Sequence, residues 1–156
     1  MVREWEAAVS LEHLLLPGCT QDVRDEELEA LWVALVHQAV RRAGGRVVGP
    51  VTRPQMAQSY YAIQTLAADG VEIRILLHAM GRLVAAARCD SSVYVLAFMP
   101  VPEGHLFTMA GLRVAAPEEL DAPFEADVTS WPKLERDDIK YHKPERVGDV
   151  LFSWFD

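Results

Sequence analysis

The spacing of the hydrophobic residues changes at the glycine pair 44–45, and this change constrains the fold more than any other feature of the sequence. In the range 23 to 43 apolar side chains recur at three- and four-residue intervals, which is the period of an amphipathic helix. Between residues 46 and 99 they alternate, and turn residues follow at short intervals, as in antiparallel strands. The pattern predicts an α+β fold: an antiparallel meander sheet of about five strands, packed by one long N-terminal helix and a short C-terminal helix.

The helix predicted for residues 23 to 43 has complementary signals at its two ends. Thr20 or Asp22 is expected to accept hydrogen bonds from the first free N–H groups. Arg41 and Arg42 suit the negative end of the helix dipole, and the glycine pair then ends the helix.

The meander is predicted to bury both faces of its sheet. Asp69 and Gly70 are expected to form a tight hairpin between the second and third strands, because both residues tolerate positive φ. In the third strand Ile73 and Ile75 face the main core, whereas Leu76 faces the other side, which the N-terminal segment or the last third of the chain would cover. The predicted strands are 46 to 51, 59 to 66, 71 to 79, 82 to 88 and 93 to 99.

Prolines recur in the last third of the chain, which is predicted to wrap the sheet without long regular elements until its end. A short amphipathic helix is predicted from Pro144, with Val147 and Trp154 on its apolar stripe. Gly148 inside it costs about 1 kcal/mol relative to alanine, so we expect a backbone packed close to this glycine. One domain is predicted, with a helical region (1–45), a sheet (46–99) and a proline-rich wrap with the terminal helix (100–156).

The net charge of -8 is distributed unevenly. Residues 1 to 45 carry eight acidic and four basic side chains, residues 46 to 102 carry three and five, and residues 103 to 156 carry twelve and six. An acidic exterior repels phosphate groups, so we expect neither nucleic acids nor membranes as partners, whereas a basic protein fits.

The sequence predicts a cytoplasmic protein. Its apolar stretches are far shorter than the roughly 20 residues that cross a bilayer. The first residues carry acidic groups where a signal peptide would carry basic ones. Cys19 and Cys89 are the only cysteines, too few for a disulfide framework, which fits a reducing compartment.

Local spacing encodes no catalytic or metal-binding motif. The five histidines form no pattern that would hold a metal, so we expect neither a metal nor a cofactor. A phosphate loop and a nucleophile elbow are both missing. Paired carboxylates such as Glu118-Glu119 and Asp137-Asp138 are interpreted as solvated surface. We therefore favour a protein that is not an enzyme.

Aromatic side chains are interleaved with acidic ones between residues 124 and 141. Interfaces favour Tyr and Trp, and acidic neighbours would steer a basic partner by long-range attraction. The opposing interpretation is that these aromatics pin an irregular segment onto the sheet. The predicted binding residues are Phe124, Asp127, Trp131, Asp137, Asp138 and Tyr141.

Two other hypotheses remain open. The chain could be a small enzyme or small-molecule-binding domain with a cleft over the sheet. It could also form a homodimer through an exposed sheet edge or through the C-terminal helix, where Phe152 and Phe155 lie off the main apolar stripe. The residues expected to line the cleft are Arg74, His78, Cys89 and His105.

The last fourteen residues carry a family resemblance. They read Lys-Pro-Glu-Arg-Val-Gly-Asp-Val-Leu-Phe-Ser-Trp-Phe-Asp, from Lys143 to Asp156. This tail resembles that of small bacterial proteins of the immunity type, which end in Lys-Pro, Val-Gly-acid, an apolar pair and a final aromatic-Asp. The resemblance implies a protein that binds and neutralises a toxin, and it assigns no site residues.

Overall fold

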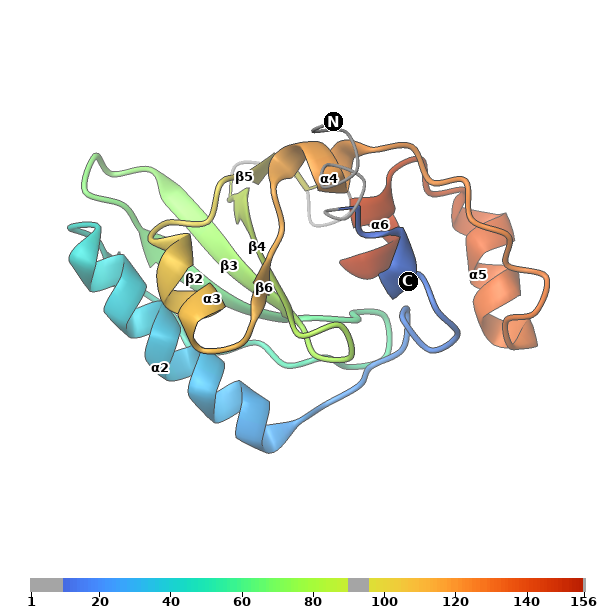
Figure 1. Ribbon diagram of the computed structural model, residues 1–156, viewed down its shortest axis with the longest axis horizontal. Helices are drawn as coiled ribbons and strands as arrows, with labels where there is room; N and C mark the ends of the chain where they lie inside the picture. Colours follow the sequence, from blue (N-terminus) through green and yellow to red (C-terminus); the bar gives the residue numbers. More distant parts are fainter. Residues whose placement is uncertain (1–9, 90–95, 156) are drawn as a thin grey trace, which may run out of the picture.

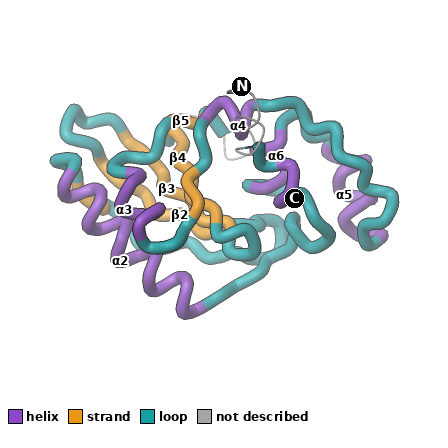
Figure 2. Tube along the Cα trace, viewed as in Figure 1, coloured by secondary structure: helices purple, strands orange, loops and turns teal. Residues whose placement is uncertain are grey.

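The computed structural model describes residues 10–89 and 96–155, which form a mixed α+β fold around one six-stranded, mostly antiparallel sheet (Figure 1 and Figure 2). The strand order is β1-β2-β3-β4-β5, and β6 pairs with β4 in parallel. The predicted fold class is confirmed at this level, whereas the parallel sixth strand was not predicted. The strands are β1 Arg46–Val47, β2 Tyr61–Leu66, β3 Glu72–His78, β4 Leu83–Arg88, β5 Phe98–Met99 and β6 Arg113–Val114.

The central strands β2, β3 and β4 follow the predicted alternation closely. The chain turns between β2 and β3 at Gly70, which has a φ of 88°, and the Asp69 carboxylate accepts a hydrogen bond from the Val71 N–H at 3.1 Å. The predicted hairpin is therefore present. Of the predicted fifth strand, residues 93 to 95 lie outside the described residues, and β5 comprises its last two residues.

The first strand is shorter than predicted. Val48 still donates to the carbonyl of Gln64 at 3.0 Å, but regular pairing ends before Gly49 and Pro50 and returns only as a single bridge at Thr52. Proline has no N–H for the ladder, so the proline interrupts the predicted strand 46 to 51.

The helix that covers one face of the sheet, α2 (Glu26–Arg42), starts three residues after the predicted boundary. Asp25 is the N-cap, and its side chain accepts a hydrogen bond from the Leu28 N–H at 3.0 Å. Neither Thr20 nor Asp22 caps the helix. The prediction was wrong because the residues before Asp25 form a separate turn that packs elsewhere.

Each face of the sheet carries its own hydrophobic core. On one face α2 and α3 (Gly104–Met109) pack on the odd-numbered residues of β2 and β3, with Trp32 fully buried among them. The opposite face holds Leu76 and is covered by the N-terminal turn, α4 (Pro117–Asp121) and α6 (Val147–Leu151). This second core confirms the expectation that the far side of the sheet is covered too.

The last third of the chain contains more regular structure than its prolines suggest. The helix α5 (Lys133–His142) has ten residues where no long element was predicted, and it lies at one end of the molecule (Figure 1). Pro132 stands immediately before α5 and serves as its N-cap residue, a place that tolerates a missing N–H. Pro117 and Pro132 thus mark the starts of α4 and α5 instead of preventing these helices.

The terminal helix α6 begins at Val147, three residues after the predicted Pro144. Lys143 ends α5 with a φ of 51°, and Pro144 lies in the connection between the two helices. Gly148 packs against the ring of Phe98 and close to the backbone carbonyl of Leu120, and the second of these contacts is the expected approach of a backbone. Trp154 follows the helix and is not part of its stripe. No helix in the described ranges has the length and apolar character needed to cross a membrane.

Candidate functional site

The N-terminal turn, residues 18–20, provides hydrogen-bond partners for two buried ionisable side chains, His78 and Glu135. His78, at the end of β3, is 2% exposed, and its Nε2 lies 2.7 Å from the Cys19 carbonyl oxygen while Nδ1 accepts from the Gly81 N–H at 3.1 Å. Burial lowers the pKa of His78. A neutral imidazole with both nitrogens bonded is a structural group, so His78 does not line a cleft as predicted.

Glu135 of α5 reaches the same turn and is 1% exposed. Its carboxylate accepts hydrogen bonds from the N–H of Gly18 at 2.7 Å, the N–H of Thr20 at 3.1 Å and the hydroxyl of Thr20 at 2.6 Å. Three donors satisfy the buried carboxylate without a cation. Glu135 therefore fastens α5 to the body of the protein.

The two cysteines lie in different surroundings. Cys19 is fully buried, and burial together with the nearby Glu135 charge raises the pKa of its thiol to about 12. Such a thiol stays protonated and unreactive. Cys89 is partly exposed at the end of β4 and has no local motif for nucleophilic catalysis.

A polar cleft of about 400 Å³ does lie over the sheet, as the small-molecule hypothesis expected. Arg74 and Cys89 line it, whereas His105 lies on α3, where its Nε2 is 3.8 Å from the Glu103 carboxylate. The structure thus brings together two of the four predicted residues. The complete lining is Thr52, Gln55, Gln58, Tyr60, Ala62, Gln64, Glu72, Arg74, Cys89 and Trp154.

The predicted binding segment, 124 to 141, divides into buried and exposed residues. Trp131 is 4% exposed and belongs to the second core, and Phe124 packs against that core. These two aromatics hold the segment onto the protein, which was the opposing interpretation. Asp127, Asp137 and Tyr141 are exposed, Tyr141 by 80%, and Asp138 is half-buried.

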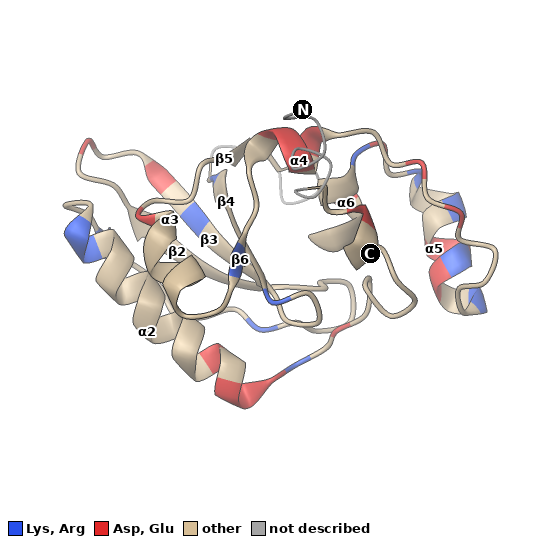
Figure 3. Ribbon diagram, viewed as in Figure 1, with Lys and Arg blue, Asp and Glu red and all other residues tan. Residues whose placement is uncertain are grey.

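The exposed face of α5 carries charges of both signs (Figure 3). Lys133 and Asp137 form an ion pair of 2.7 Å, which lowers the pKa of that carboxyl. Arg136 and Lys140 lie on the same helix, so its surface is not acidic overall. The helix is a weak attractor for a basic partner.

A more acidic part of the chain includes α4, where Figure 3 shows the ribbon coloured red at acidic positions that are close together. Between Val114 and Pro132 the chain carries five acidic residues and no lysine or arginine. A cleft of about 350 Å³ opens there, with an apolar floor and an acidic rim; we call it the acidic cleft. Its rim is formed by Glu12, Glu118, Glu119 and Glu125, and its floor includes Leu11, Ala122, Pro123 and Val147.

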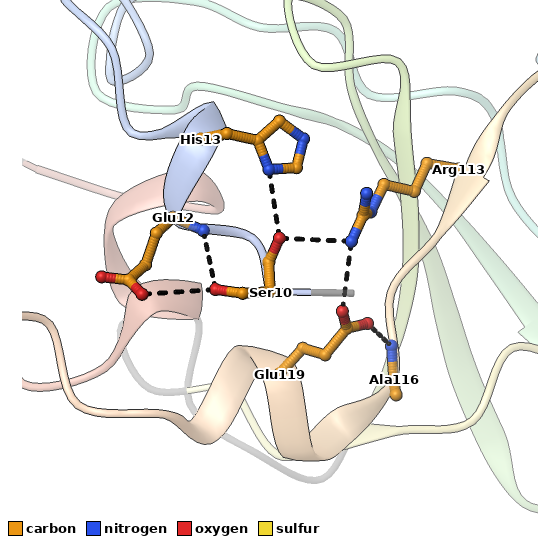
Figure 4. A network of polar contacts seen from close by, with 6 residues as sticks. All are labelled: Ser10, Glu12, His13, Arg113, Ala116 and Glu119. Carbon is orange, nitrogen blue, oxygen red and sulfur yellow. Dashed lines mark hydrogen bonds and ion pairs between the residues drawn. The ribbon is translucent and has the colours of Figure 1, made fainter. Parts of the chain in front are cut away.

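A hydrogen-bond network fixes one side of the acidic cleft (Figure 4). Arg113 donates to the Ser10 carbonyl and to the Glu119 carboxylate, each at 3.3 Å. The other oxygen of Glu119 accepts from the Ala116 N–H at 2.8 Å and so caps α4. Glu12 bonds to the Ser10 hydroxyl at 3.4 Å. The network joins β6 and α4 to residues 10–12 near the start of the described chain, and it holds two of the four glutamates in place.

The other two glutamates of the acidic cleft are available for binding. Glu118 and Glu125 are exposed, and neither has a hydrogen-bond or ion-pair partner within residues 10–89 and 96–155. Their exposure agrees with the interpretation of these carboxylates as solvated surface, whereas the cleft that they line was not predicted. The signal that could have revealed them is the run of nineteen residues, 114–132, without a basic side chain.

Within the described part of the chain, no three histidine, cysteine or acidic side chains are grouped so as to hold a metal ion. The candidate chemistry therefore comes from charge and shape: one cleft rich in carboxylates and one that contains an arginine. The chain matches no protein-family model, and no significantly similar protein was found among curated proteins or solved structures.

Proposed function

We propose that this chain is a non-enzymatic protein-binding module, and that its acidic cleft takes up a basic segment of a partner protein. The observation that carries the proposal is the pair Glu118 and Glu125, two exposed carboxylates on the rim of a cleft with an apolar floor, for which the described residues supply no partner. No cation offsets them in the stretch between Val114 and Pro132.

A lysine or arginine side chain complements such a cleft in both of its parts. Its aliphatic stem covers apolar surface while its charged end reaches a polar rim. Pro123 and Ala122 offer apolar surface for the stem above the buried Leu11 and Val147, and Glu118 and Glu125 offer acceptors for the charge. Asp127, two residues after Glu125, is also exposed and would add to the long-range attraction of a basic partner.

The tail resemblance supports a more specific form of the proposal. An immunity-type protein acts in the cytoplasm by binding a toxin. Neutralisation by binding requires a preformed surface that contacts the toxin and requires no catalytic group. A basic toxin is therefore the partner that we propose.

A comparison of two immobilised proteins tests the proposal. The wild type and a Glu118→Gln/Glu125→Gln variant are exposed to an extract of the native host at low salt. A Glu26→Gln/Glu27→Gln variant has the same charge change on the exposed start of α2 and serves as the control. We expect a basic protein that the wild type and the control retain, that salt releases, and that the cleft variant does not retain.

Two results would overturn the proposal. One is the same set of retained proteins on all three columns, which would show that the acidic cleft contributes no specificity. The other is a specific partner whose affinity is unchanged by the loss of both cleft carboxylates. Circular dichroism of each variant ensures that differences in retention do not come from unfolding.

A further inference from the structure

The cleft over the sheet contains a cation for which the described residues supply no counter-ion. Arg74 points from the middle of β3 into this cleft and is half-buried. Among the described residues its guanidinium has no hydrogen bond and no carboxylate within ion-pair distance. A partly buried arginine usually pairs with an acid, so the missing partner indicates a place for an anion.

Tyr60 supplies a second polar group without a partner. Its side chain is 2% exposed and lines the same cleft, and the edge of its ring packs on Phe152 with ring centres 5.7 Å apart. Its hydroxyl has no hydrogen-bond partner in the part of the chain that the structure describes. Burial raises the pKa of this phenol and the charge of Arg74 lowers it, so the two groups share one electrostatic environment. The phenol stays protonated and is available as a donor.

The carboxylate of Glu72 limits the negative charge that a ligand in this cleft can carry. Glu72 lies two residues before Arg74 on the same face of β3, and Gln64 donates to it at 3.2 Å. Side chains two positions apart on a strand are separated by about 6.6 Å. Glu72 therefore leaves Arg74 unpaired but repels a second negative charge on a ligand.

We propose that this cleft binds a small organic molecule that carries one carboxylate. The carboxylate accepts hydrogen bonds from the guanidinium of Arg74 and from the hydroxyl of Tyr60. The indole of Trp154 forms an apolar wall for the body of the molecule, and the amides of Gln55 and Gln58 line the remaining side. Arginine suits this task because its planar donors match a carboxylate in two parallel hydrogen bonds.

Benzoate is a suitable probe, since it has one carboxylate and an aromatic body that fits beside Trp154. We expect saturable binding to the wild type by isothermal titration calorimetry and a matching rise in thermal stability. Arg74→Gln should weaken benzoate binding at least tenfold. Arg41→Gln, which removes an exposed arginine at the end of α2, should leave the affinity unchanged. Failure of benzoate and acetate to bind the wild type at 10 mM, a concentration about ten thousand times the Kd of a micromolar ligand, would overturn the proposal.

Two milder variants separate binding from folding. Tyr60→Phe keeps the packing on Phe152 and should weaken benzoate binding roughly threefold to tenfold through the loss of one donor. Glu72→Gln should strengthen binding of inorganic phosphate relative to benzoate, because the repulsion of the second charge is removed. Unchanged benzoate affinity in both Arg74→Gln and Tyr60→Phe would contradict the proposed anchor. The acidic cleft uses other residues, so either proposal can fail without the other.

Discussion

His78 of β3 and Glu135 of α5 hold the same three-residue turn from two different elements. His78 bonds to the carbonyl of Cys19, and Glu135 accepts from the groups of Gly18 and Thr20 on either side of it. The turn thereby connects the sheet to a helix that lies at the far end of the molecule (Figure 1). The first two predictions concern these two contacts.

Glu135→Gln should destabilise the protein although the substitution keeps the size of the side chain. The NH₂ of the glutamine would face N–H and O–H donors of Gly18 and Thr20. At least one of these buried donors would then have no acceptor. Each buried donor without a partner costs about 1–3 kcal/mol. Urea unfolding measures the loss. Glu145→Gln, at an exposed position just beyond α5, is the control and should change the free energy of unfolding by less than about 0.5 kcal/mol. A stable Glu135→Gln protein would refute the anchoring role.

The stability of the protein should fall as the pH drops below about 6.5, the ordinary pKa of histidine. Burial lowers the pKa of His78 in the folded state, so between these two values the unfolded chain binds a proton that the folded chain does not. The contribution of neutral His78 to the free energy of unfolding is fully present above the pKa that histidine has in the unfolded chain. It is lost as the pH falls towards the lower pKa of His78 in the folded state, at up to about 1.4 kcal/mol per pH unit.

Urea unfolding at a series of pH values checks the prediction. His78→Gln should flatten the slope between pH 5 and pH 6.5, whatever its effect at neutral pH. His105→Gln should retain the slope, because its ring on α3 is largely exposed. Equal slopes in the wild type and in His78→Gln would rule out His78 as the source.

Gly148→Ala should destabilise the protein even though alanine favours a helix. An added Cβ would collide with the Phe98 ring and lie 3.0 Å from the Leu120 carbonyl oxygen. Overpacking of this kind costs about 1–3 kcal/mol. Gly104→Ala is the matched control in α3, where the added Cβ meets only Val114 at 3.4 Å. In thermal unfolding, we expect Gly148→Ala to lower the Tm and Gly104→Ala to raise it. A Gly148→Ala protein as stable as the wild type would contradict the close packing.

The central strands β2, β3 and β4 were predictable because their pattern is local. Alternation along β2 and β3, with a glycine at the turn, sets the hairpin and its register whatever the rest of the chain does. The same holds for the second core, since Leu76 on the polar-looking face of β3 requires a cover. Both inferences need only neighbours in the sequence.

The helix α5 and the strand β6 were not predictable in this way. Eight of the ten residues of α5 are polar or charged, and its one fully buried residue is a glutamate, so it lacks the apolar stripe that reveals a helix. The two residues of β6 are too few to show any period. These elements depend on tertiary contacts: Glu135 on the turn 18–20 for the helix, and the backbone of β4 for the strand.

The candidate sites were only partly predictable for a related reason. Arg74 and Cys89 share a cleft because β3 and β4 are neighbours, which the meander implied. The acidic cleft brings Glu12 close to glutamates that follow it by more than a hundred residues, and no local sequence pattern predicts this proximity. Charge composition predicted the sign of the surface, and the fold determined its place.

Both borders of the sheet end in two-residue strands, and this has a consequence for how the molecule can meet a copy of itself. β1 stops before a proline, and the outer side of β4 is shared between β5 and β6, which run in opposite directions. Within the described residues, an incoming strand would find too short a row of unpaired backbone groups to extend the ladder. Phe152, at 3% exposed, is also withdrawn into the interior. Self-association by extension of the sheet is therefore disfavoured at these two borders.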